Sequence, residues 1–90
     1  MDILPGKTVE RLSEYRRNLL GYLESGNDYI YSHELAALLH ITAVQVRRDL
    51  MLIGYSSVMK KGYDVKELIK TIGIILDSDE GQNVAVIGLG

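Results

Sequence analysis

Residues 32–54 are the stretch that most constrains the fold, because their pattern predicts two short helices joined by a tight turn. Ser32 and Thr42 are expected to cap the first and the second helix. Apolar residues recur at helical spacing in both halves, as Leu35, Ala36, Leu38 and Leu39 and then as Val46, Leu50 and Ile53. His40 and Ile41 lie between them as the turn. This arrangement predicts a helix-turn-helix unit.

The opposite face of the second helix carries side chains that suit DNA. Arg and Gln bind guanine and adenine edges in the major groove, and a small apolar residue can contact a thymine methyl group. A recognition helix presents its N-terminal residues to the bases in this way. The candidate DNA-binding residues of this unit are Ser32, Thr42, Ala43, Val44, Gln45, Arg47 and Arg48. The alternative is an amphipathic helix pair of any small α domain, with two solvated arginines.

A further helix precedes this unit. Thr8 is expected to cap it, and residues 25–28 are expected to end it. Its predicted core positions are Leu12, the stem of Arg16, Leu19, Leu20 and Leu23, with Val9, Tyr15 and Tyr22 on the flanks. Arg11, Arg16 and Arg17 could touch DNA phosphates, pair with Glu10 and Glu14, or face a neighbouring domain, and a solvated face is the default for each.

Short β segments complete a winged-helix pattern. Residues 29–31 are aromatic and β-branched and predict a three-residue strand. Residues 55–63 can form the hairpin that pairs with it, with Lys60 and Lys61 at a basic tip that would lie against DNA; an ordinary surface loop is the alternative. The predicted fold is therefore mainly α with a small β-wing, a winged helix-turn-helix DNA-binding domain.

The last third of the chain predicts a second unit. Asp64 and Glu67 form a capping box before an apolar helix face, and residues 78–82 are polar. Residues 83–90 are a nearly continuous apolar run that ends in Gly88 and Gly90, as a buried strand enters a phosphate-binding turn. The predicted division is a winged-helix domain at 1–77, a linker at 78–82, and at 83–90 the first strand of a truncated Rossmann domain. A terminal strand that pairs with the wing is the alternative.

Composition excludes several other classes. The chain has 90 residues and no cysteine, so it has room for one small domain and cannot form a disulfide or a cysteine-based zinc site. Two histidines alone cannot hold a metal ion, and no Ser/His/Asp or Cys/His constellation suggests an enzyme. No apolar run reaches the length of a membrane span, so we expect a protein of the cytoplasm.

Net charge counts against a nucleic-acid binder, but its distribution weakens the objection. The formal net charge is -2, whereas affinity for phosphates comes mainly from Lys and Arg. Residues 1–63 carry eight basic against seven acidic groups, and residues 64–90 carry two against five. The acidic excess therefore lies in the C-terminal third, outside the predicted helix-turn-helix unit.

The chain resembles the Rex family of bacterial redox-sensing repressors. The motifs that carry the resemblance are Thr8-Val9, Arg11-Leu12 and Tyr15, Ser32 with Leu35-Ala36, Gln45 to Leu50, Gly54, Gly62 to Val65 with Leu68, and Val84 to Gly90. The resemblance implies a winged-helix domain followed by a Rossmann domain that binds NADH and NAD⁺. It also implies homodimers that bind palindromic operators as repressors and leave DNA when NADH binds.

Roles follow from the resemblance at the matching positions. Gln45, Arg47 and Arg48 match the family's recognition helix, and Ser32 matches a helix cap near the phosphates. Gly88 and Gly90 match the first glycines of the dinucleotide motif, although this stretch alone is not expected to bind NAD(H) well. Arg11 matches an arginine near the domain boundary. The segment 56–63 departs from the family pattern by losing two glycines and shifting the basic pair.

The sequence also allows two other interpretations. A repressor of the DeoR kind often carries the same Arg-Arg-Asp-Leu run, but the glycine-rich C-terminal run and the Gly-Tyr-Asp-Val before the last helix speak against it. Alternatively, the helical part could be an amino-terminal interaction cap of a dinucleotide-dependent dehydrogenase. Such a cap would not need a basic pair on the outward face of its second helix.

Overall fold

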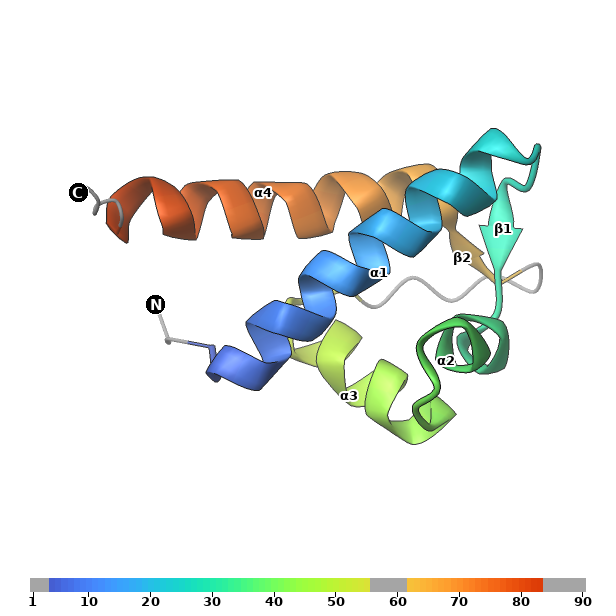
Figure 1. The fold of residues 1–90 in the computed structure, drawn as a ribbon, viewed down its shortest axis with the longest axis horizontal. Helices are drawn as coiled ribbons and strands as arrows, with labels where there is room; N and C mark the ends of the chain where they lie inside the picture. Colours follow the sequence, from blue (N-terminus) through green and yellow to red (C-terminus); the bar gives the residue numbers. More distant parts are fainter. Residues whose placement is uncertain (1–3, 56–61, 84–90) are drawn as a thin grey trace.

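The described part of the chain folds into four helices and a small sheet (Figure 1). The computed structural model describes residues 4–55 and 62–83, with side chains described as far as Asp77. In chain order the elements are α1 (Gly6–Glu24), β1 (Tyr29–Ile30), α2 (Ser32–Leu39), α3 (Ala43–Leu52), β2 (Tyr63–Asp64) and α4 (Val65–Asn83). In Figure 1, α1 crosses α4 diagonally, and α2 and α3 lie on the other side of α1. The predicted class, mainly α with a small sheet, is confirmed.

One hydrophobic core joins the four helices, with α4 on one side of α1 and α2 and α3 on the other. Its buried apolar residues are Leu12, Tyr15, Leu19, Ile30, Leu35, Ala36, Val46, Leu50, Tyr55, Val65, Leu68, Ile72 and Leu76. Tyr15, expected on a flank, is completely buried, whereas Leu20, expected in the core, is 46% exposed. The buried stripe of α1 runs through positions 12, 15 and 19, and burial of Tyr15 is tolerated because its hydroxyl has a polar partner inside the domain.

Of the three helix caps predicted for α1, α2 and α3, one is right and two are wrong. Thr42 Oγ1 accepts a hydrogen bond from Gln45 N at 3.0 Å, as expected for an N-cap. Thr8 is instead a buried residue inside α1, whose N-cap is Pro5. Ser32 is the first residue of α2 rather than its cap, because Tyr31 takes that position and its N–H donates to Glu34 Oε1 at 2.8 Å.

The two strands pair antiparallel, with Tyr29 opposite Asp64 and Ile30 opposite Tyr63. Gly62 leads into β2 with φ of +105°, and a Cβ at this position would lie 2.7 Å from the carbonyl oxygen of Ile30. A side chain is therefore excluded here on two grounds. The predicted hairpin tip, with Lys60 and Lys61, lies outside the described residues.

The last helix is longer than the sequence pattern suggested. Asp64 Oδ1 accepts a hydrogen bond from Glu67 N at 3.1 Å, so the predicted cap is present. α4 then continues to Asn83, and the stretch 78–82 expected as a polar linker is helical. Once a helix is nucleated each added residue costs little, and Gly81 within this stretch lowers the stability of α4 by only about 1 kcal/mol. The expected strand 83–90 begins at a residue that ends α4, and its remainder lies outside the described residues.

Candidate nucleic-acid interface

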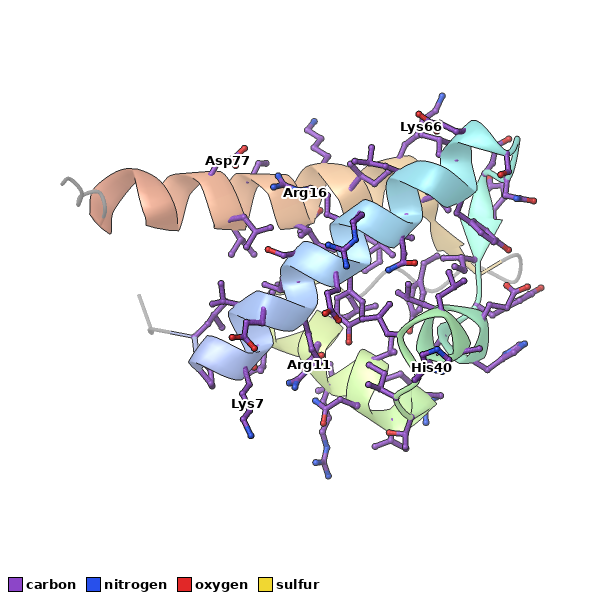
Figure 2. The ribbon with its side chains drawn as sticks, viewed as in Figure 1. Lys7, Arg11, Arg16, His40, Lys66 and Asp77 are labelled. Carbon is purple, nitrogen blue, oxygen red and sulfur yellow. The ribbon has the colours of Figure 1, made fainter. Side chains whose placement is uncertain are left out.

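The helix-turn-helix unit is formed by α2, a three-residue turn and α3 (Figure 1). His40 caps the C-terminal end of α2 in the left-handed conformation, with φ of +60°, and Figure 2 labels it beside this helix. Val46 and Leu50 are buried, and Ile53, the residue that caps α3 at its C-terminus, packs against the core. The inward face of α3 is therefore as predicted, which leaves its opposite face outward.

The outward face of α3 is both apolar and basic. Val44 is 50% exposed and Met51 is 74% exposed. Arg48 is exposed between them and lines a shallow depression with Met51 and Leu52. Within residues 4–55 and 62–77, no hydrogen bond or ion pair engages the Arg48 guanidinium. Of the predicted base-contacting side chains, Arg48 and Val44 thus project freely from α3.

Other predicted contact residues are partly occupied within the domain. Arg47 Nη1 donates to Ser32 Oγ at 3.3 Å, which joins α3 to the start of α2 at an exposed position. Thr42 is exposed but uses its hydroxyl as the cap of α3. Ala43 packs partly against the core. The structure therefore brings Ser32 and Arg47 together, while Ala43 offers less outward surface than predicted.

Gln45 belongs to a polar network centred on Asp49, one turn further along α3. Gln45 Nε2 donates to Asp49 Oδ1 at 3.0 Å. Arg11 on α1 donates to the same carboxylate twice, from Nε to Oδ2 at 2.7 Å and from Nη2 to Oδ1 at 3.0 Å. The hydroxyl of Tyr15 donates to Oδ2 at 2.5 Å. Asp49 is completely buried and accepts four hydrogen bonds from three side chains.

The protonation states of this network follow from its geometry. Burial by itself would raise the pKa of Asp49, but the hydrogen bonds from Arg11, Tyr15 and Gln45 outweigh it and leave this pKa below its usual value. Burial and the neighbouring carboxylate raise the pKa of Tyr15. The hydrogen bond to Asp49 raises the pKa of Arg11. Asp49 is thus an ionised carboxylate at neutral pH, held by a cation and two neutral donors.

The two arginines of α1 that were predicted together occupy opposite sides of the domain. Figure 2 shows Arg11 on the side of α1 that faces α3 and Arg16 beside α4. Arg16 Nη1 lies 3.6 Å from Asp77 Oδ1, and both side chains are substantially exposed. Arg11 is the buried carboxylate's partner, so it is not an open phosphate contact in this structure.

Asp49 is the polar residue that sequence reasoning missed. Its spacing of four from Gln45 puts both on one face of a helix, and this was the one local signal available. Its other partners lie 34 and 38 residues away, on a different helix. Nothing in the helical period of either segment indicated that they would meet.

The described part of the chain shows no metal-binding or membrane-spanning feature. No group of three or more His, Cys, Asp or Glu side chains is arranged to hold a metal ion within the residues that the structure describes. Over the same residues, none of the helices is both long and apolar enough to cross a membrane.

Comparisons with known proteins agree with a DNA-binding unit. Residues 3–50 match the family described as "Putative DNA-binding protein N-terminus". The chain is 38% identical over 87 residues to the redox-sensing transcriptional repressor Rex of Lactobacillus acidophilus, covering 97% of this chain and 41% of that protein. It is 36% identical over 89 residues to Rex of Chloroflexus aurantiacus, covering 99% of this chain and 42% of the relative.

Solved structures give the same likeness. The crystal structure of RSP, described as a Rex-family repressor, matches with a TM-score of 0.74 and 33% identity over 88% of this chain and 36% of RSP. RSP in complex with β-NADH matches with a TM-score of 0.71 and 32% identity, over 88% of this chain and 35% of RSP. The chain thus spans about two fifths of the length of the curated relatives it matches.

Proposed function

We propose that this chain binds duplex DNA through the outward face of α3. The chain belongs to the Rex family and corresponds to the N-terminal DNA-binding part of its members. The observation that carries the proposal is Arg48, an exposed guanidinium on that face with no partner among the described residues. A bidentate Arg–guanine contact is the commonest specific contact in the major groove. Val44, one turn earlier and 50% exposed, has the size and position to meet a thymine methyl group.

The remaining candidate residues take supporting roles in this proposal. Arg47, beside Ser32 at the start of α2, is placed to contact the phosphate backbone and fix the register of the domain. Thr42 and Ala43 set the first turn of α3, and Gln45 meets a base edge. Lys60 and Lys61 would bring positive charge to the backbone from the wing.

The whole protein's activity follows as part of the same proposal. RSP is described in complex with β-NADH, and the curated relatives are described as redox-sensing repressors. We therefore expect a cytoplasmic homodimer that binds an inverted-repeat operator, with Gly88 and Gly90 opening an NAD(H)-binding Rossmann domain. NADH would release DNA by moving the paired α3 helices off the spacing of about 34 Å that a two-fold operator requires.

Arg16 and Arg11 would serve this movement differently. Arg16 lies on the α4 side of the domain, away from α3, so its position supports coupling to a neighbouring domain rather than DNA contact. Arg11 would act inside the domain, since its guanidinium is bound to Asp49 of α3.

A binding assay tests the DNA-reading role directly. The chain is titrated with a duplex that carries an inverted repeat of the Rex type, TTGTGAA with its complement, and with a scrambled duplex, across a salt series. We expect selective binding to the repeat, lost in Arg48→Ala and kept in Lys66→Ala, a variant at the start of α4 rather than on α3. Because a single DNA-binding domain binds an inverted repeat more weakly than two linked domains do, the same series is run on the full-length protein. Equal binding of the full-length protein to both duplexes would contradict the proposal.

A second candidate function has one observation behind it. Met51 and Leu52 are 74% and 56% exposed, beside Arg48, and such residues are common where proteins meet. An interaction cap on a dinucleotide-dependent enzyme would use this apolar surface and leave Arg48 without effect on DNA. The Arg48→Ala result therefore separates the two functions.

A further inference from the structure

The network beneath α3 has a consequence for base recognition, which rests on the DNA-binding function proposed above. We infer that Asp49 is a positioning residue that locks the Gln45 carboxamide in the one orientation that reads adenine. Gln45 is the third residue of α3, in the turn that a recognition helix presents to base edges. Asp49 is completely buried and cannot touch DNA, so it acts through Gln45.

The carboxylate fixes which end of the amide faces inward. An ionised carboxylate only accepts hydrogen bonds, whereas the Gln side chain carries an NH₂ donor at one end and a carbonyl acceptor at the other. The NH₂ group faces Asp49, with Nε2 at 3.0 Å from Oδ1. A flipped amide would set its carbonyl oxygen against the carboxylate, which is repulsive. Gln45 therefore has one amide orientation where a solvated Gln has two.

The locked orientation leaves free what adenine requires. One N–H of the NH₂ group bonds Asp49, so the second N–H and the carbonyl oxygen remain available. Adenine presents an acceptor at N7 and a donor at N6 in the major groove, and a Gln amide matches both at once. Cytosine, guanine and thymine do not offer this pair of groups on one base. The lock thus favours adenine over the other bases.

The lock is held by α1 rather than by α3 alone. Arg11 supplies two hydrogen bonds to Asp49 and Tyr15 supplies one, and both come from a helix that also crosses α4. Tyr15 is completely buried, so the carboxylate cannot rotate without breaking buried contacts. Since fixing a side chain before binding removes its ordering cost from the association step, this network raises selectivity at one base position.

The first experiment locates the base that Gln45 reads. Each base pair of the half-site is changed in turn, and affinities are measured for the wild type and for Gln45→Met, which keeps the length of the side chain and removes the amide. We expect one A·T position where discrimination is about tenfold in the wild type and absent in Gln45→Met. At that position, 7-deazaadenine, which lacks N7, and purine, which lacks the N6 amino group, should each weaken wild-type binding. Unchanged base preferences in Gln45→Met would overturn the inference.

The second experiment removes the lock without touching Gln45. The apolar network variant carries Arg11→Met, Tyr15→Phe and Asp49→Leu, because replacing a buried ion pair by apolar residues of similar volume often preserves stability. We expect this variant to bind the operator over the scrambled duplex through Arg48, while its adenine discrimination falls below about threefold. Lys66→Met, on α4, should keep the full discrimination. Full adenine discrimination in the apolar network variant would refute the positioning role.

The outcomes separate this inference from the proposed function. If the wild type binds the operator and the scrambled duplex equally, the proposed DNA recognition is refuted. If the wild type is selective but its adenine preference persists in the apolar network variant, only the positioning role of Asp49 is refuted. If the apolar network variant does not unfold cooperatively, hydrogen exchange of the wild-type Gln45 NH₂ group decides. We expect one of its two protons to be protected in the free protein; exchange of both at the rate of free glutamine would overturn the lock.

Discussion

Removing the charge of Asp49 should destabilise the domain strongly. In Asp49→Asn the side chain keeps its shape, but its NH₂ group faces the donors of Arg11 or Tyr15 and the ion pair is lost. Breaking a buried ion pair at one partner costs about 3–5 kcal/mol of unfolding free energy. A domain of this size has a total stability of roughly 5–13 kcal/mol, so the variant should fold with a much reduced margin.

The structure places the expected loss near the lower end of that range. Asp49 is completely buried, but the Arg11 side chain is 24% exposed and can regain hydration once its partner is gone. The hydroxyl of Tyr15 cannot, and an unsatisfied buried donor costs about 1–3 kcal/mol. We therefore expect a loss of about 3 kcal/mol, which lowers the melting temperature by roughly 12–24 °C.

A second ion pair among the described side chains is the matched control. Arg16 and Asp77 lie 3.6 Å apart with side chains 35% and 77% exposed, and such exposed pairs contribute about 0–1 kcal/mol. Urea unfolding of Asp49→Asn and Asp77→Asn, followed by circular dichroism at neutral pH, measures both. A loss in Asp49→Asn no larger than that in Asp77→Asn would refute the argument that the Asp49 network is a buried support of the fold.

Three further predictions follow from the same contacts. Because the folded-state pKa of Asp49 lies below its unfolded value of 3.8, its stabilising contribution is present above about pH 4 and is lost as the pH falls further. In urea unfolding at pH 3 and pH 6, the unfolding free energy should therefore fall less with acid in the apolar network variant than in the wild type. Gly62→Ala should cost about 2 kcal/mol or more, since φ is +105° and the new Cβ would lie 2.7 Å from Ile30 O, whereas Gly26→Ala, with φ of +93° and open space, should cost less in the same assay. Thr42→Ala should lower the unfolding free energy by about 1 kcal/mol through loss of the α3 cap, with Thr42→Ser near the wild type.

Local patterns predicted the elements because local spacing decides them. The apolar residues of α3 recur every three or four positions, and Val46 and Leu50 are buried as that period requires. Helix starts were less predictable, since several residues can satisfy the first N–H groups. Ser32 is a suitable cap by type, yet Tyr31 takes the position because Glu34 reaches back to its N–H. The end of α4 was placed too early because polar residues alone do not stop a helix.

The hydrogen-bond network of Asp49 beneath α3 could not be predicted from the sequence. Arg11 and Asp49 are 38 positions apart, and each alone is typical of a solvated helix face. Their pairing depends on how α1 crosses α3, and this crossing is set by the whole core. Sequence reasoning therefore named Gln45 and Arg48 together as DNA-contacting residues of α3, without a contact that holds either of them. The structure separates them, because the first is held from beneath and the second is free.

This separation offers a reason why an acidic chain could still recognise DNA. With a net charge of -2, general attraction to phosphates is weak, and Arg11 and Arg16 are paired with Asp49 and Asp77. What remains for selectivity is the placement of a few side chains on α3. A free guanidinium at Arg48 adapts its reach to the groove, whereas a Gln amide that nothing held at position 45 would have two orientations, and its donor and acceptor would match N7 and N6 of adenine in one of them. The buried carboxylate thus lies under the one side chain on this face whose orientation needs to be fixed.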